Sequence, residues 1–235
     1  MNPKPMNLEP TTNLYQPSIM RIAEARDEAP DVRTLRLEFT DEVFKTAFFN
    51  GYRTGMFGLY GLPGEGESVF CVASPPTRTG YIECTFRKAG RVTTALFARE
   101  AGQTITFRCP YGNSFPIDSW RGRDLLFIAG GIALPPLRSV ICNILDRRRE
   151  FGRVRIVYGA RTTADLVYKQ ELQEWAQRKD VDLTVTVDPG GETPDWKGKV
   201  GFVPTVLKEL APAAENCTAI VCGPPIMIKL TMPVL

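Results

Sequence analysis

The sequence predicts two domains of different fold class, an N-terminal antiparallel β-barrel followed by an α/β domain with a parallel sheet. The first half of the chain contains short β-prone runs separated by Gly, Pro and Asp turns, which is typical of small all-β domains. After Ser119, strand-like and helix-like segments alternate, and this pattern predicts right-handed βαβ units. The length of 235 residues is sufficient for two domains.

Composition excludes several classes of function. The chain is 43% hydrophobic, as expected of a globular protein, and its formal charge of +3 is too small to indicate a nucleic-acid partner. No apolar stretch approaches the roughly 20 residues needed to span a bilayer, so we expect no direct membrane insertion. The sequence has no histidine, which excludes Ser-His-Asp triads and histidine-bound zinc or haem.

Six cysteines are spread along the chain without a C-x-x-C pair or a tight cluster, so we expect no bound metal. Thiols in a chain without a signal peptide indicate a reducing compartment, and we expect a cytoplasmic protein. The cysteines are Cys71, Cys84, Cys109, Cys142, Cys217 and Cys222.

Residues 1–17 are proline-rich and lack a periodic apolar pattern, which predicts an extended tail. We expect the β-barrel over residues 18–119 and the α/β domain over residues 120–235. In the barrel, the clearest alternation places Ile82, Cys84 and Phe86 on one face of a strand. The expected strands are Ile19–Ala25, Val32–Phe39, Met56–Tyr60, Val69–Ala73, Tyr81–Lys88 and Thr104–Arg108.

In the α/β domain we expect four strands and four helices in alternation. Three loops follow the carboxyl ends of strands, GGIALPP after Ala129, GART after Tyr158 and CGPP after Val221. Ligands of open α/β sheets bind outside these ends, so the three loops indicate a binding site. The expected strands are Leu125–Ala129, Arg153–Tyr158, Leu183–Val187 and Ala219–Cys222, and the expected helices are Leu134–Arg149, Leu166–Arg178, Val203–Leu210 and a segment from Pro225 onward.

The segment Leu125–Ser139 is the strongest strand-turn-helix pattern of the chain. An apolar run ends at Gly130 and Gly131, and Pro135 and Pro136 are suited to open a helix because their missing N–H has no intrahelical partner there. Such a unit points backbone N–H groups and a helix N-terminus at a ligand phosphate. The alternative interpretation of this segment is a tight turn that binds no ligand.

Other features also allow two interpretations. GRVTTALF, which begins at Gly90, combines a glycine with the hydroxyls of Thr93 and Thr94, and predicts either a pyrophosphate site or a capped connecting helix. Cys222 is either a structural thiol or a soft group held against a flat ligand. The basic cluster that starts at Arg147 is either a solvated helix end or a docking patch.

The order of motifs resembles the ferredoxin–NADP reductase superfamily. After the barrel and its GxVT helix come PYGNSFP, LLFIAGGIALPPLRS, VYGARTTADLVYKQEL, VDPGGETPDWKGKVGFVP and CGPPIMIK. Within this superfamily, the chain more closely resembles the gamma subunits of hydrogenase and sulfur reductase complexes and the dihydroorotate dehydrogenase electron-transfer subunit. The resemblance covers about residues 18–235.

The resemblance implies a flavin reductase, with FAD in the barrel, a nicotinamide nucleotide on the α/β domain and hydride passing between them at the domain interface. The cofactors then carry the chemistry and the protein positions them. By position, Cys222 is expected beside the nicotinamide ring and is the candidate catalytic residue. The flavin-binding candidates are Ser68, Val69, Phe70, Cys71, Gly90, Val92 and Thr93, and the nucleotide-binding candidates are Gly130, Gly131, Gly159, Ala160, Arg161, Gly223 and Pro224.

Some positions depart from the motifs of the superfamily. Ser68 stands where an arginine would neutralise FAD phosphate, so Arg87, Lys88 or Arg91 is expected to substitute for it. Cys71 replaces a hydroxyl residue expected near flavin N5. Phe70, as an aromatic residue on a strand, is either core or flavin wall. In the first nucleotide loop, Ala133 and Pro135 stand at positions more often occupied by Gly and Ala.

The resemblance implies iron–sulfur electron-transfer subunits of a larger complex as partners. Relatives usually continue past CGPPIMIK with a four-cysteine [2Fe–2S] segment, whereas this chain stops at Leu235, so we expect that cluster only if a further segment exists. NAD is favoured over NADP because GARTTADL carries no second cation beside Arg161. Two alternatives are a non-catalytic docking subunit with a decayed flavin site and a free-standing reductase for an oxygenase.

Overall fold

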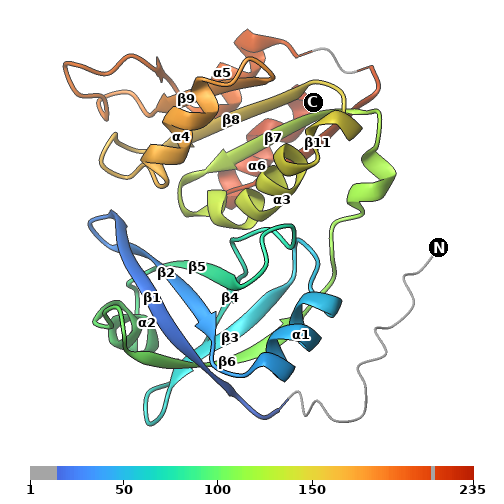
Figure 1. Ribbon diagram of the computed structural model, residues 1–235. Coiled ribbons are helices and arrows are strands. Elements are labelled where there is room, and N and C mark those ends of the chain that lie inside the picture. The colour runs from blue at the N-terminus through green and yellow to red at the C-terminus, as the bar shows by residue number, and fades with distance from the viewer. Residues whose placement is uncertain (1–14, 213–214) are drawn as a thin grey trace. The chain divides into compact units, whose positions relative to one another are not determined.

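The computed structural model describes residues 15–212 and 215–235, so most of the predicted tail lies outside the described residues. These residues form two compact units (Figure 1). The main division lies between Phe115 and Pro116, a few residues before the expected boundary. Of the described residues, unit 1 comprises 15–26 together with Arg33–Phe115. Unit 2 comprises Pro116–Leu235 and the short segment Asp27–Val32.

Unit 1 is built on a six-stranded sheet in the order β4-β3-β6-β1-β2-β5. Strand β1 pairs with β6, and β3 with β4 and β6, in antiparallel fashion, as predicted. The Ala73 N–H donates to the Glu83 carbonyl at 2.7 Å, which joins the segment after β4 to β5 and connects the two edges of the sheet into a barrel. The strands are β1 (Ser18–Ala29), β2 (Val32–Phe39), β3 (Phe57–Leu62), β4 (Gly66–Cys71), β5 (Tyr81–Arg87) and β6 (Thr104–Tyr111).

The barrel core contains the predicted apolar face of β5, with Ile82, Cys84 and Phe86 all buried. Tyr60 lies in the same core, and its hydroxyl has no hydrogen-bond partner among the described residues. Burial, followed by the neighbouring thiols, raises the pKa of Tyr60 well above its ordinary value, so the phenol is neutral. The alternate, polar residues of β5 are buried as well. Thr85 shares a 2.7 Å hydrogen bond with Thr34 there.

Two helices accompany the barrel, α1 (Glu42–Gly51) and α2 (Arg91–Phe97). No element was expected from the sequence at the position of α1. This helix begins after Asp41, whose carboxylate accepts hydrogen bonds from the N–H groups of Val43 (2.8 Å) and Phe44 (2.9 Å). It is held by aromatic packing of Phe48 on the barrel core. Its formation therefore depends on tertiary contacts more than on a long periodic pattern.

Unit 2 contains a five-stranded parallel sheet in the order β10-β9-β8-β7-β11, as the alternating pattern predicted, apart from the short β10. Figure 1 shows α3 and α4 on one face of this sheet and α5 and α6 on the other. The strands are β7 (Asp124–Gly130), β8 (Val154–Ala160), β9 (Val181–Val187), β10 (Lys199–Val200) and β11 (Cys217–Cys222), and the helices are α3 (Leu134–Asp146), α4 (Lys169–Ala176), α5 (Val203–Leu210) and α6 (Pro225–Thr231). The short 3-10 turns are η1 (Ile117–Trp120), η2 (Gly131–Ala133), η3 (Arg148–Glu150) and η4 (Met232–Val234).

Helices α3 and α4 are shorter than predicted. Helix α3 ends at Asp146 and is followed by the turn η3, whereas it was expected to reach Arg149. Helix α4 begins at Lys169, later than the expected Leu166, because Tyr168 adopts a left-handed conformation with φ of 56°. Leu166 and the residues up to Tyr168 are buried instead of helical, so their apolar pattern reflects packing of an irregular segment.

One face of the parallel sheet forms a defined apolar cluster with helices α5 and α6. Leu126 and Ile128 of β7 pack with Val203 of α5 and Met227 of α6. Successive residues of a strand point to opposite faces of the sheet. Leu125 and every second residue after it in β7 therefore face the helices on the other side. Within residues 15–212 and 215–235, no helix is long and apolar enough to cross a membrane.

Candidate functional site

The three predicted loops of unit 2 meet at one edge of the parallel sheet. In the register of the strands, Gly130 at the end of β7 is paired with Gly159 of β8. On the other side of β7, Ala129 is paired with Cys222, the last residue of β11. Because all these strands are parallel, their carboxyl ends lie at the same edge. The loops that begin at Gly130, Gly159 and Cys222 are therefore neighbours.

The strand order places a topological switch point between β7 and β11. From β7 the chain proceeds to β8 and β9 on one side, and it later returns to form β11 on the other side of β7. Open α/β sheets bind ligands in the crevice outside the carboxyl ends of strands at such a point. The candidate nucleotide site thus lies beside the ends of β7 and β11.

Most of the glycines at this edge are required for close packing of helices on the strands. A Cβ on Gly130 would lie 2.5 Å from the Met227 Sδ atom, and one on Gly223 would lie 2.3 Å from the Met227 Cε atom. A Cβ on Gly159 would lie 2.3 Å from a methyl group of Val203. Gly131 is different. Its φ is +57° and no atom of the described residues lies within 4 Å of the place a Cβ would take, so its backbone is left accessible to a ligand.

Tyr158 joins two of these loops and was not among the predicted site residues. Its side chain is completely buried. The hydroxyl donates to the Gly131 carbonyl at 3.3 Å and accepts from the Val167 N–H at 3.2 Å. The sequence signal was its position in VYGART, directly before the second loop.

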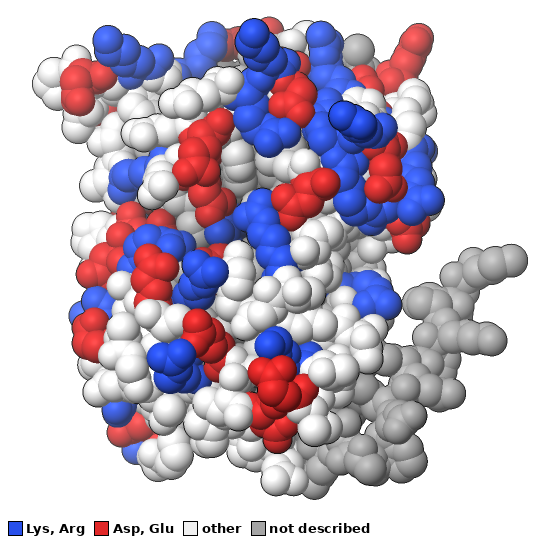
Figure 2. Space-filling view, in the orientation of Figure 1, with Lys and Arg blue, Asp and Glu red and all other residues white. Residues whose placement is uncertain are grey.

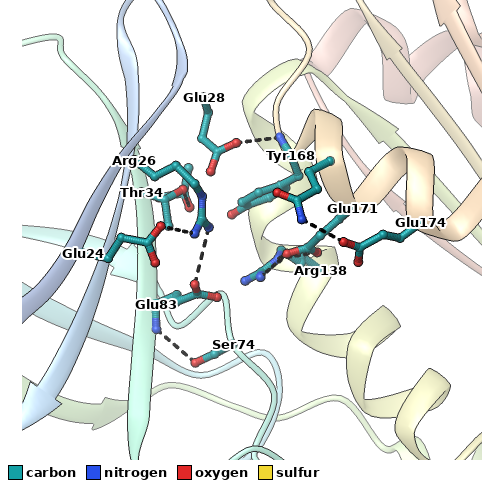
Figure 3. Close-up of polar contacts among 12 residues, drawn as sticks. Glu24, Arg26, Glu28, Thr34, Ser74, Glu83, Arg138, Tyr168, Glu171 and Glu174 are labelled. Atoms are coloured by element: carbon teal, nitrogen blue, oxygen red, sulfur yellow. Dashed lines mark hydrogen bonds and ion pairs between the residues drawn. The ribbon is translucent and has the colours of Figure 1, made fainter.

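A partly buried ion pair connects α3 to α4 (Figure 3). The Arg138 Nε atom lies 2.9 and 2.8 Å from the two carboxylate oxygens of Glu171, and its guanidinium also lies over the Tyr168 ring at 4.6 Å. The side chain of Arg138 is 4% exposed. The Tyr168 N–H in turn donates to the Glu28 carboxylate at 2.9 Å. This cluster fixes the segment between the second loop and α4.

The second loop carries one exposed cation beside a carboxylate. Arg161 is exposed, and Ala160 before it is buried at the end of β8. The Asp188 N–H donates to the Ala160 carbonyl at 3.1 Å, which brings the start of the loop after β9 next to this loop. Partial burial raises the pKa of Asp188, and the nearby Arg161 charge opposes that shift. Asp188 was not among the predicted site residues.

Cys222 ends β11 and Pro224 lies two residues after it, at the switch point. Cys222 is half-buried, and burial raises the pKa of its thiol. It is therefore a neutral thiol near neutral pH rather than a nucleophilic thiolate. Pro224 precedes α6 and its carbonyl accepts the Ile228 N–H at 3.1 Å.

In unit 1 the flavin candidates Ser68, Val69, Phe70 and Cys71 lie on β4, an edge strand of the sheet order. Ser68, Phe70 and Cys71 are partly exposed, while Val69 is 56% exposed. The Phe70 ring packs inward, with its centroid 5.4 Å from that of Phe86. Phe70 is therefore a core residue in this structure, although part of it remains accessible.

The second group of flavin candidates surrounds the start of α2. The space beside Gly90 is open, because no described atom lies within 4 Å of the position that a Cβ would occupy there. The Thr93 hydroxyl accepts the N–H groups of Ala89 (2.9 Å) and Gly90 (2.8 Å), so it caps the helix. Val92, beside it, packs against the barrel core.

Three cations lie within three residues of Gly90 in the chain. Arg87 ends β5 and is half-buried, and Lys88 is exposed, with its ammonium 5.0 Å from the centroid of the Phe97 ring. Arg91 is held by the Glu65 carboxylate at 2.7 Å and by a backbone carbonyl. This donor set fits a pyrophosphate, because it combines open backbone with positive charge.

The basic cluster lies at the opposite, amino-terminal edge of the unit 2 sheet. Figure 2 shows Lys and Arg side chains gathered there, interspersed with Asp and Glu. Arg147 is paired with Asp118 and Glu150 at 2.7 Å each, and Arg121 pairs with the same two carboxylates. These shared pairs give the arginines local partners, as expected of a solvated helix end.

Among the described residues, no group of three or more Cys, Asp or Glu side chains is arranged to hold a metal ion.

Comparison with known proteins agrees with the geometry of unit 2. Residues 127–232 match the oxidoreductase NAD-binding domain. The chain is 35% identical to sulfhydrogenase 1 subunit gamma of Pyrococcus furiosus over 76% of its length. The chain is also 29% identical, over 92% of its length, to sulfhydrogenase 2 subunit gamma of the same organism.

These relatives are longer than the matched region. The chain spans 61% of the first and 77% of the second. It is also 30% identical over 78% of its length to the reductase component DmpP of phenol 2-monooxygenase from a Pseudomonas species, of which it spans 53%.

A solved structure has the same two-domain fold. It is a ferredoxin NADP⁺ reductase from Neisseria gonorrhoeae, with a TM-score of 0.74 and 18% identity, and the match covers 93% of this chain and 89% of that one.

The close contact between Gly159 and Val203 leads to a stability prediction. Gly159→Ala is expected to lower the free energy of unfolding by about 1–3 kcal/mol, because the added methyl group overpacks the contact between β8 and α5. Urea denaturation measures this change. In the double variant Gly159→Ala/Val203→Ala the clash is relieved, so the double variant should lose less stability than the two single changes added together. Strictly additive losses would contradict the predicted clash.

Proposed function

We propose that this chain is an NAD(P)H-dependent flavin oxidoreductase that carries FAD on unit 1 and binds the nicotinamide nucleotide on unit 2. The observation that carries the proposal is the convergence of three loops, at Gly131, Gly159 and Cys222, on the switch-point edge of a parallel sheet. This is the place where such sheets bind nucleotides, and it lies within the residues that match the oxidoreductase NAD-binding domain.

On unit 2, the chain would hold the nucleotide phosphates at the accessible Gly131 backbone, where the turn η2 leads into α3. The positive end of the α3 dipole favours an anion there, and Pro135 occupies a first-turn position where no intrahelical N–H bond is lost. Pro224 and Gly223 would line the other side of the crevice, after β11.

On unit 1, the partly exposed edge of β4 from Ser68 to Cys71 would contact the flavin ring system. The open space at Gly90, with Arg87, Lys88 and Arg91 nearby, would hold the pyrophosphate in place of the arginine missing at Ser68. The chemistry that a bound flavin supplies is acceptance of a hydride and release of its electrons one at a time.

We propose NADH as the preferred nucleotide. NADPH differs from NADH by a 2′-phosphate, and binding that phosphate requires several hydrogen-bond donors. Arg161 is one exposed cation, and the Asp188 carboxylate lies close to it. A carboxylate at this edge of the sheet suits a ribose 2′-hydroxyl, which can donate to it, and repels a phosphate.

The proposed electron acceptor is an iron–sulfur subunit of a larger complex, because the matched relatives include two sulfhydrogenase gamma subunits. A cytoplasmic location agrees with the cysteines, all six of which are described and none of which forms a disulfide. A second candidate, a reductase for an oxygenase, is favoured by the similarity to the phenol 2-monooxygenase reductase component. Steady electron transfer from the isolated chain to a small carrier would support this second candidate.

The direct test is to reconstitute the purified chain with FAD, remove excess flavin and measure the visible absorbance before and after anaerobic addition of NADH or NADPH. We expect about one FAD per chain and its bleaching by NADH, with kcat/KM for NADH about tenfold above that for NADPH, or about 1.4 kcal/mol. Absence of bound flavin would contradict the proposal and would support a docking subunit whose flavin site has decayed.

Cys222 has a separate test. Its half-buried neutral thiol at the switch point suits contact with a flat ring, so Cys222→Ala should slow flavin reduction by NADH about tenfold. The dissociation constant of NADH should change by less than about threefold. Stopped-flow absorbance measures both values. Cys217→Ala, at the amino end of the same strand, is the matched control. An unchanged reduction rate in Cys222→Ala would exclude this role.

A further inference from the structure

A single buried hydroxyl links the two loops that flank the ends of β7 and β8. Tyr158 lies in the centre of the parallel sheet, where it pairs with Ala129 of β7 and Val185 of β9, and its side chain has no exposed surface. Its Oη atom reaches the Gly131 carbonyl at 3.3 Å and the Val167 N–H at 3.2 Å. One donated and one accepted bond match the capacity of a phenol hydroxyl.

Each end of this link is a segment whose backbone is not fixed by a sheet or an α-helix. Gly131 has a left-handed φ of +57° and begins the turn that leads to α3. Val167 is buried in the irregular segment before Tyr168, which is itself left-handed at φ 56°. Hydrogen bonds from side chains therefore help to define where these two segments lie relative to each other.

A second brace joins the same two parts of the chain. Arg138, on α3 after the first loop, forms its ion pair with Glu171 on α4 and lies over the Tyr168 ring (Figure 3). This brace connects the helices, whereas Tyr158 connects the loops nearer the strand ends. Loss of the hydroxyl should therefore loosen the loops while the helices remain held together.

We propose that Tyr158 is a positioning residue, whose hydroxyl holds the first and second loops at the separation that the nicotinamide nucleotide requires. This inference rests on the proposed function of the same edge. Because the side chain is completely buried, it acts through the Gly131 carbonyl and the Val167 N–H. Holding both loops in advance lowers the ordering cost of binding, which raises affinity.

The test is Tyr158→Phe in the full chain, which removes one oxygen and keeps the ring that fills the sheet. We expect the dissociation constant of NADH to rise about tenfold, which corresponds to about 1.4 kcal/mol. In steady state, KM should rise while kcat stays within about twofold, because binding is weakened without a change in the reacting groups. Without any nucleotide, amide exchange should become faster in residues 131–133 and 162–168.

Tyr60→Phe is the matched control, since it removes a completely buried tyrosine hydroxyl that has no hydrogen-bond partner among the described residues. It should leave the dissociation constant of NADH and exchange in both loops unchanged. A Tyr158→Phe variant with wild-type affinity and wild-type loop exchange would overturn the inference. A wild-type chain that binds neither NADH nor NADPH would instead contradict the proposed function, and exchange without nucleotide would still decide whether Tyr158 holds the loops.

Discussion

The register of β7 with its two parallel neighbours is the constraint on which the candidate site depends. It places Gly130 beside Gly159 and Ala129 beside Cys222, so three loops distant in sequence begin at one edge. That register is stabilised by alternating side chains that pack against helices on both faces of the sheet. A shift of one residue would exchange the two faces and turn Leu126 away from its apolar cluster with α5 and α6. The same packing that stabilises unit 2 therefore also assembles its ligand edge.

The glycines at this edge have two different roles, because some allow close helix packing and one leaves its backbone open to a ligand. Gly130, Gly159 and Gly223 lack a side chain because α5 and α6 approach the strand ends closely. Gly131 lacks one in an open place with a left-handed backbone, which is the combination suited to a ligand. A conspicuous Gly-Gly pair thus contains one glycine with a packing role and one suited to binding.

Patterns of apolar residues were sufficient to predict the two domains, the parallel sheet and the strand that ends at Gly130, because burial on a sheet leaves a regular signal. They did not predict α1, whose formation depends on the Asp41 cap and aromatic packing. Nor did they identify Tyr158 or the position of Asp188, because hydrogen bonds between distant loops leave no periodic trace. The assignments of individual residues to flavin or nucleotide, including Cys222, remain predictions.

We propose that a nicotinamide nucleotide binds at the carboxyl edge of the unit 2 sheet, through loops that are held in place beforehand. Hydrogen exchange measured by mass spectrometry with and without NADH tests it most directly. We expect slower exchange in residues 131–134, 160–163 and 222–226, with no change at the basic amino-terminal edge around residues 147–153. Protection at the amino-terminal edge, or protection at neither edge with NADH in saturating excess, would contradict it.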